Sequence, residues 1–167
     1  MIKKLFLIRH GSAHEKEAHQ KDFDRKLTSD GIRDSVLVGK YIFQHFKNPS
    51  IIISSSANRC AETASIIAEQ LKFDTSKVDQ RQDLYESSVR SLLQAVNELP
   101  EEADAVIIVA HNPSISYLAD YLTEENVESM PPASLAVIEF QELEWAEVSE
   151  KNGDISLFLK PETLQKS

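Results

Sequence analysis

Three short apolar runs, each followed at once by polar residues, constrain the fold of this chain more than any other feature. They cover residues 2–8, 51–53 and 105–110, and the second consists of three isoleucines. Continuous runs of this length, rich in β-branched residues, are typical of strands buried on both faces of a sheet. Helical patterns separate them, which indicates βαβ units and a parallel sheet.

Four segments between and after these runs show the apolar spacing of amphipathic helices. The first begins at the capping residues Thr28-Ser29-Asp30 and ends before Asn48-Pro49, and Ser87 or Ser88 caps the third. Pro113 suits the first turn of the fourth. The apolar positions of the four helices are, in order, Ile32, Val36 and Phe43; Ala61, Ala64, Ala68 and Leu71; Val89, Leu92, Leu93 and Val96; and Ile115, Leu118, Ala119 and Leu122.

The C-terminal part of the chain reads as strands. We expect strands near residues 135–140, 143–149 and 155–159, with the last two joined across the turn signal Asn152-Gly153. We predict a single domain over residues 1–160 and a flexible C-terminal tail over residues 161–167. The order of elements predicts an α/β fold: a three-layer αβα sandwich on a mainly parallel central sheet, with a C-terminal β-hairpin.

Charge and composition exclude several classes of partner. The 167-residue chain carries a formal net charge of −9, which argues against nucleic acid or an anionic membrane as a partner. It has no apolar stretch long enough to span a membrane and no signal-like N-terminal segment. Its one cysteine, Cys60, rules out an internal disulfide. A single cysteine fits a reducing compartment, so we expect a cytoplasmic protein. We also expect a monomer, although no pattern in the sequence indicates the oligomeric state.

Basic residues follow the three apolar runs. Arg9-His10-Gly11 ends the first, Arg59 lies shortly after the second, and His111 follows the third. If the strands are parallel, these residues meet at one edge of the sheet, where open α/β sheets bind ligands. A histidine beside arginines in an acidic protein indicates a nucleophile next to an anion-binding clamp.

The same residues carry a resemblance to a known family. The chain resembles the histidine phosphatase (phosphoglycerate mutase-like) superfamily, and within it the short SixA-type phosphohistidine phosphatases. The motifs that match are Leu7-Ile8-Arg9-His10-Gly11, the segment from Ser54 to Ala64 around Arg59, and Val109-Ala110-His111-Asn112-Pro113. Three segments indicate the SixA-type branch: Arg25 to Gly31, His111-Asn112-Pro113 and Met130-Pro131-Pro132-Ala133.

The resemblance implies a role for each residue. His10 would attack phosphorus and carry a transient phosphohistidine, while Arg9 and Arg59 bind the phosphoryl oxygens. A protonated His111 would add a third positive donor. Because the arginines and His111 supply the charge, no metal and no cofactor is required. A backbone carbonyl near Gly11 could hold one nitrogen of His10 so that the other faces phosphorus.

The proton donor and the substrate stay open at this stage. Glu86 falls about where ester-cleaving relatives place a carboxylic acid, but it is equally well explained as a solvated glutamate before a helix. The resemblance favours phosphohistidine on a signalling or phosphotransfer protein as substrate. The alternatives are a phosphatase for small phosphorylated metabolites and a non-catalytic phosphate-binding module.

Overall fold

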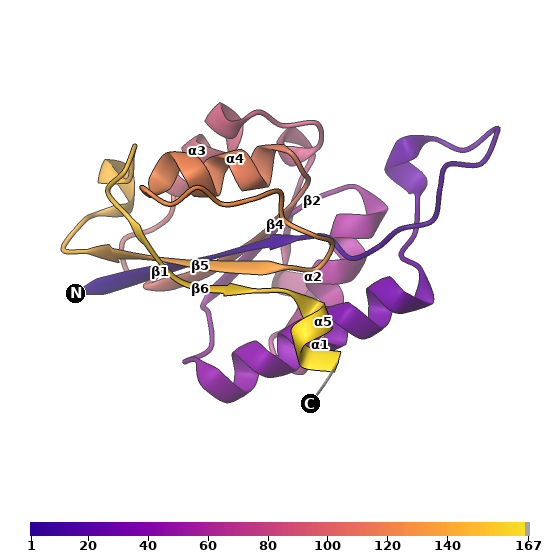
Figure 1. Ribbon diagram of the computed structural model, residues 1–167, viewed down its shortest axis with the longest axis horizontal. Helices are drawn as coiled ribbons and strands as arrows, with labels where there is room; N and C mark the ends of the chain where they lie inside the picture. Colours follow the sequence, from indigo (N-terminus) through magenta and orange to yellow (C-terminus); the bar gives the residue numbers. More distant parts are fainter. Residues whose placement is uncertain (166–167) are drawn as a thin grey trace.

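Six strands form one sheet within residues 1–165, the part of the chain that the computed structural model describes (Figure 1). The strand order is β3-β2-β4-β1-β5-β6. Strands β1 to β4 are parallel, and β5 and β6 are an antiparallel hairpin joined to β1. The strands are β1 (Ile2–Arg9), β2 (Ile51–Ser55), β3 (Asp79–Arg81), β4 (Ala105–Ala110), β5 (Leu135–Gln141) and β6 (Asp154–Leu159).

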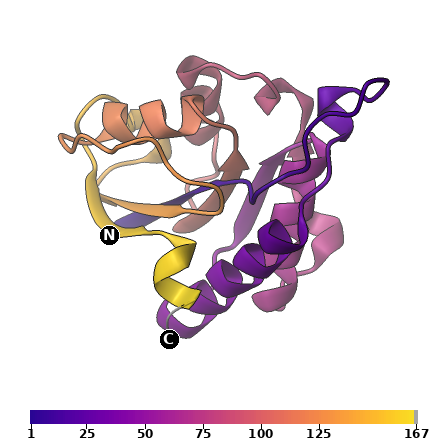
Figure 2. The ribbon, with the colours of Figure 1, turned by 45° about the vertical axis from the view of Figure 1, so that its right-hand side comes forward.

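Helices cover both faces of the sheet, as Figures 1 and 2 show. One core lies between the sheet and α3 with α4, and a second core lies between the sheet and α1 with α2. The predicted three-layer α/β fold is therefore confirmed. The helices are α1 (Ser29–His45), α2 (Asn58–Gln70), α3 (Val89–Asn97), α4 (Ser114–Leu122) and α5 (Pro161–Gln165). None of the helices in residues 1–165 has both the length and the apolar character needed to cross a membrane.

The parallel pairing brings three strand ends to one edge of the sheet. Arg9 at the end of β1 pairs with Ala110 at the end of β4, and Ser54 of β2 pairs with Val109 of β4. The next residues in each chain segment therefore leave the sheet side by side. This is the edge at which the sequence predicted the site.

Helix α1 begins where the sequence predicted it but buries a different face. Thr28 caps the helix by accepting a hydrogen bond from the backbone N–H of Gly31 at 3.0 Å. Ile32 and Phe43, predicted to face inward, are each 43% exposed. The buried face contains small residues because α1 packs closely on α2. A side chain at Gly39 would place its Cβ 2.8 Å from Cβ of Gln70.

The predicted strand over residues 143–149 is wrong. The C-terminal hairpin pairs β6 with β5 instead, and the segment between them contains a short 3-10 helix, η4 (Trp145–Glu147). Trp145 is fully buried, and its indole N–H donates to the carbonyl of Ala103 at 2.6 Å. Burial of this large side chain pulls the segment out of the sheet and into the core.

The C-terminal segment also differs from the prediction. Residues 161–165, predicted as part of a flexible tail, form the short helix α5 against α1. The side-chain amide of Gln165 donates to Asp34 at 2.6 Å, which ties the segment to α1. The remainder of the predicted tail, residues 166–167, lies outside the described residues.

Candidate active site

A cavity of about 450 Å³ lies at the edge where the three strands end. Its lining includes all five residues that the sequence singled out, namely Arg9, His10, Arg59, Glu86 and His111. Arg9 and His10 come from the end of β1, Arg59 from the first turn of α2, and His111 from the residue after β4. The structure therefore brings together side chains that are up to 102 positions apart in the chain (111 − 9).

His10 is held in one tautomer by its own backbone. Its Nδ1 lies 2.7 Å from the carbonyl oxygen of Gly11, and a carbonyl can only accept. Nδ1 therefore carries the ring proton, and Nε2 has a free lone pair. The sequence-based expectation of a carbonyl near Gly11 is confirmed.

His10 is also held in its neutral form. The residue is 8% exposed. Burial lowers the pKa of His10 from its ordinary value of 6.5 to about 3, and the charges of His111, Arg59 and Arg9 act in the same direction. The hydrogen bond to Gly11 opposes this only in part. A neutral imidazole with a free lone pair is the form that can act as a nucleophile.

Gly11 is required by the close packing behind His10. Its backbone N–H donates to the hydroxyl of Thr63 at 3.0 Å, and that hydroxyl donates to the carbonyl of Arg59 at 2.7 Å. A Cβ on Gly11 would lie 2.7 Å from the carbonyl oxygen of Gly31. Because Gly11 has no side chain, the loop that carries His10 can pack closely enough for the Thr63 hydroxyl to link it to Arg59.

The two arginines are each anchored at one end and unpaired at the other. Arg9 donates from Nη1 to the carbonyl of Met130 at 2.9 Å. Arg59 donates from Nη1 to the carbonyl of Asp22 at 2.9 Å and from Nη2 to its carboxylate at 3.0 Å. Within the described residues, the buried Nε of each arginine has no hydrogen-bond partner. Buried donors without a partner are rare, so these two N–H groups distinguish both arginines from ordinary structural ones.

His111 is also neutral in this structure. Nη2 of Arg59 lies 3.4 Å from its Nδ1, and Nε2 lies 2.8 Å from the hydroxyl of Ser55. Because a guanidinium only donates, Nδ1 accepts and the proton belongs on Nε2. Burial and then the charge of Arg59 lower the pKa of His111 to about 4. The positive donor that the sequence hypothesis requires therefore forms only if an incoming anion raises this pKa.

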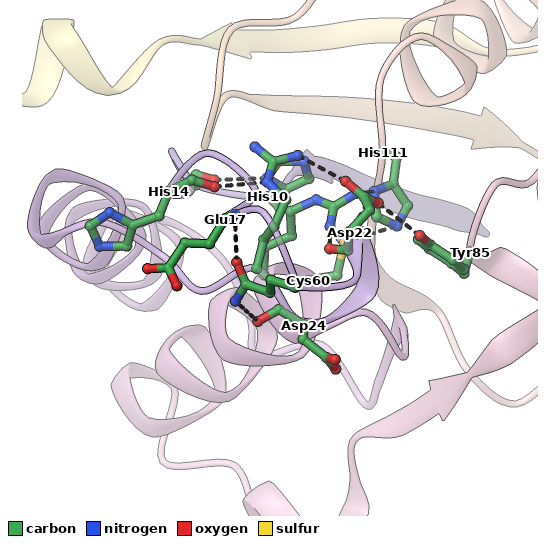
Figure 3. A network of polar contacts seen from close by, with 12 residues as sticks. His10, His14, Glu17, Asp22, Asp24, Cys60, Tyr85 and His111 are labelled. Carbon is green, nitrogen blue, oxygen red and sulfur yellow. Dashed lines mark hydrogen bonds and ion pairs between the residues drawn. The ribbon is translucent and has the colours of Figure 1, made fainter.

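Two residues outside the predicted site, Asp22 and Tyr85, also shape the cavity. Asp22 lies on a short 3-10 helix, η1 (Asp22–Asp24), and its carboxylate accepts hydrogen bonds from Arg59 and from the hydroxyl of Tyr85, the latter at 2.7 Å (Figure 3). Tyr85 precedes Glu86, and its ring lies edge-on to His111. Asp22 and Arg25 lie three positions apart in a polar loop. Such a pair is common in solvated loops, so the sequence gives only a weak indication that these residues belong to a site.

Cys60 is a packing residue of the site. Its side chain is fully buried, with the sulfur 3.4 Å from Nε2 of His111. Burial raises the pKa of the Cys60 thiol to about 12, which keeps it protonated and unreactive. Among residues 1–165, no three or more histidine, cysteine or acidic side chains are grouped as a metal site would require.

The two lowered histidine pKa values predict how stability depends on pH. Unfolded histidines take up protons near pH 6.5, whereas folded His10 and His111 do so only near pH 3 and pH 4. The unfolded state therefore gains stability as the pH falls below 6.5, and the free energy of unfolding decreases. For His111 alone this loss is about 2 kcal/mol at pH 5. Urea midpoints at pH 7.5 and pH 5 measure it.

The matched variants are His111→Asn and His19→Asn, since His19 is exposed. We expect the difference between the two pH values to shrink in His111→Asn and to stay unchanged in His19→Asn. An equal difference in the wild type and in His111→Asn would contradict a buried neutral His111.

Sequence comparison identifies similar proteins. The family model described as "Histidine phosphatase superfamily (branch 1)" matches residues 5–92. An uncharacterized protein from Mycobacterium leprae is 26% identical over 105 residues, which are 63% of this chain and 62% of that protein. The chain thus matches less than two thirds of this relative's length.

Comparison with solved structures shows the same fold. The histidine phosphatase SixA complexed with tungstate superposes with a TM-score of 0.83 at 21% identity, covering 96% of this chain and 99% of that one. The candidate phosphohistidine phosphatase SixA of Nakamurella multipartitia has a TM-score of 0.80 at 23% identity, covering 96% and 97%. A mycobacterial glucosyl-3-phosphoglycerate phosphatase has a TM-score of 0.70 at 16% identity, covering 94% and 98%.

Proposed function

Because the chain belongs to the histidine phosphatase superfamily, we propose that it is a phosphatase that hydrolyses phosphohistidine on a signalling or phosphotransfer protein. The reaction passes through a covalent phosphohistidine on His10. The proposed setting is the cytoplasm, with the protein acting as a monomer and without a metal.

The orientation of His10 is the observation that carries this proposal. Its Nδ1 is tied to the carbonyl of Gly11 at 2.7 Å, so that Nε2 is a free nucleophile inside the cavity. Arg9 and Arg59, each with a buried Nε that has no partner within residues 1–165, line the same cavity. A phosphoryl group supplies the phosphorus atom that Nε2 attacks and the oxygens that accept hydrogen bonds from the arginines.

The proposed reaction has two steps. First, Nε2 of His10 attacks phosphorus, the P–N bond of the substrate breaks, and its electron pair stays on the leaving imidazole. Second, water attacks phosphorus, the bond to His10 breaks, and inorganic phosphate leaves with the oxygen of water. Arg9 and Arg59 stabilise the charge on the phosphoryl oxygens in both steps. The protein therefore acts mainly by positioning the phosphoryl group and neutralising its negative charge.

A phosphoester phosphatase is the second candidate. Glu86 lines the cavity, where it could protonate an alkoxide leaving group. The fold likeness to a mycobacterial glucosyl-3-phosphoglycerate phosphatase is compatible with a small phosphorylated metabolite as substrate. An imidazole leaving group, by contrast, needs no acid from Glu86.

A substrate panel separates the two candidates. We expect the wild type to hydrolyse a phosphohistidine peptide at least about 10-fold faster, in kcat/KM, than phosphoserine or phosphoglycerate. Glu86→Gln should change phosphohistidine turnover by less than about 3-fold, because general acid catalysis, worth about 10²- to 10⁴-fold, is not used there. Faster ester turnover that falls about 100-fold in Glu86→Gln would overturn the proposal and support the second candidate.

A further inference from the structure

Asp22 is the point at which three hydrogen-bond donors of the cavity meet. Its Oδ2 accepts from Nη2 of Arg59 at 3.0 Å and from the hydroxyl of Tyr85 at 2.7 Å. Its Oδ1 accepts from Nη1 of Arg25 at 3.0 Å. Figure 3 shows Asp22 directed toward Tyr85 and His111, while Asp24 of the same short helix points away from them. The carboxylate is thus fixed at the rim of the cavity.

These contacts keep Asp22 ionised. Each of its three partners donates, and donated hydrogen bonds favour the ionised form of a carboxyl. Although burial acts to raise it, the hydrogen bonds from Tyr85, Arg25 and Arg59 hold the pKa of Asp22 well below its ordinary value of 3.8. The lining of the cavity therefore combines two cationic arginines with the permanent negative charge of Asp22.

Asp22 also has room for one more partner. A carboxylate accepts about four hydrogen bonds, and three are used here. The side chain is 41% exposed and Asp22 lines the cavity, so its remaining acceptor capacity can serve a group bound there. A phosphoryl anion cannot use it, since two negative charges would meet. A cationic N–H group on the substrate can.

We propose that Asp22 accepts a hydrogen bond from the protonated ring nitrogen of the leaving imidazole and thereby selects phosphorylated nitrogen over phosphoesters. This inference rests on the proposed function and names the group that recognises the leaving side of the substrate. The imidazole nitrogen that does not carry phosphorus bears the proton and donates to Asp22.

The chemistry of the leaving group explains why this contact accelerates the reaction. A phosphorylated imidazole whose other nitrogen is protonated leaves as neutral imidazole when the P–N bond breaks and the electron pair moves to the ring. No proton has to be supplied during bond cleavage. A negative carboxylate beside the ring favours this protonated form of the bound substrate. The same carboxylate repels substrates whose leaving side carries a carboxylate, such as phosphoglycerate.

Asp22→Asn is the informative variant because the backbone carbonyl of residue 22 still accepts from Arg59, as it does now at 2.9 Å. The control is Asp24→Asn, which removes the same charge from the same short helix at an exposed position. Two substrates are compared: a phosphohistidine peptide and p-nitrophenyl phosphate, whose leaving group is an anion with no N–H to donate.

We expect Asp22→Asn to lower kcat/KM for the phosphohistidine peptide at least about 10-fold more than that for p-nitrophenyl phosphate, whose own loss measures the weaker anchoring of Arg59. The loss of phosphohistidine turnover at high pH should begin at lower pH in Asp22→Asn, because the bound ring is protonated less readily. Asp24→Asn should match the wild type in each of these measurements.

Equal losses for both substrates, with an unchanged pH profile, would overturn this inference, since Asp22 would then only orient Arg59. That outcome would leave the proposed function intact. A wild type that does not hydrolyse the phosphohistidine peptide at all would overturn the proposed function and this inference together.

Discussion

Replacing His10 by alanine is expected to lower turnover of a phosphohistidine substrate by about 10⁴-fold or more, the effect of removing a catalytic nucleophile. The imidazole of His10 is neutral, with the ring proton held on Nδ1, and an alanine side chain offers no nucleophile in its place. The measurement is kcat with a phosphohistidine peptide, determined from the rate at which inorganic phosphate is released.

Anion binding separates a chemical defect from a folding defect in this variant. Arg9 and Arg59 keep their anchors at Met130 and Asp22 when the imidazole is removed. We therefore expect His10→Ala to bind tungstate within about 10-fold of the wild type by calorimetry. His19→Ala, at an exposed site, is the activity control. Residual turnover within about 10-fold of the wild type would contradict the role of His10.

Replacing Arg59 by lysine is expected to have the second largest effect, a loss of about 10³-fold in kcat. A lysine keeps the positive charge but loses the planar fork. It cannot donate to both the backbone carbonyl and the carboxylate of Asp22 and keep a further N–H group, as Arg59 does. Arginines that stabilise transferring phosphoryl groups contribute effects of this size.

The matched control for Arg59→Lys is Arg81→Lys. Arg81 also forms a two-point contact with an aspartate, Asp83, but outside the cavity lining. We expect Arg81→Lys to stay within about 2-fold of the wild type in kcat. If Arg59→Lys did the same, charge alone would account for anion binding and the pre-arranged fork would be irrelevant.

The sequence could predict which residues meet at the sheet edge because these residues follow apolar strands. A buried parallel strand has a clear signal, and its carboxyl end is the ligand edge of such a sheet. Arg9, His10 and His111 could therefore be placed together before any coordinates. Arg59 could be assigned to the same edge because it lies shortly after β2 (Ile51–Ser55).

The parts that could not be predicted depend on tertiary packing. The inward face of α1 is decided by its close approach to α2, which favours Gly39 over Phe43 at the contact. Trp145 lies in a stretch with the alternation of a strand, but burial of its indole against Ala103 prevents pairing. Asp22 lies in a polar loop whose path over the cavity is determined by Arg59 and Tyr85, residues distant in the chain.

The most direct test of the central claim is a rapid-quench experiment with a ³²P-labelled phosphohistidine protein and stoichiometric enzyme. The account predicts label on the enzyme within the first turnover, labile to acid, stable to base, mapping to His10 and missing in His10→Ala. Phosphate release without any labelled enzyme would show direct attack by water and would contradict the account.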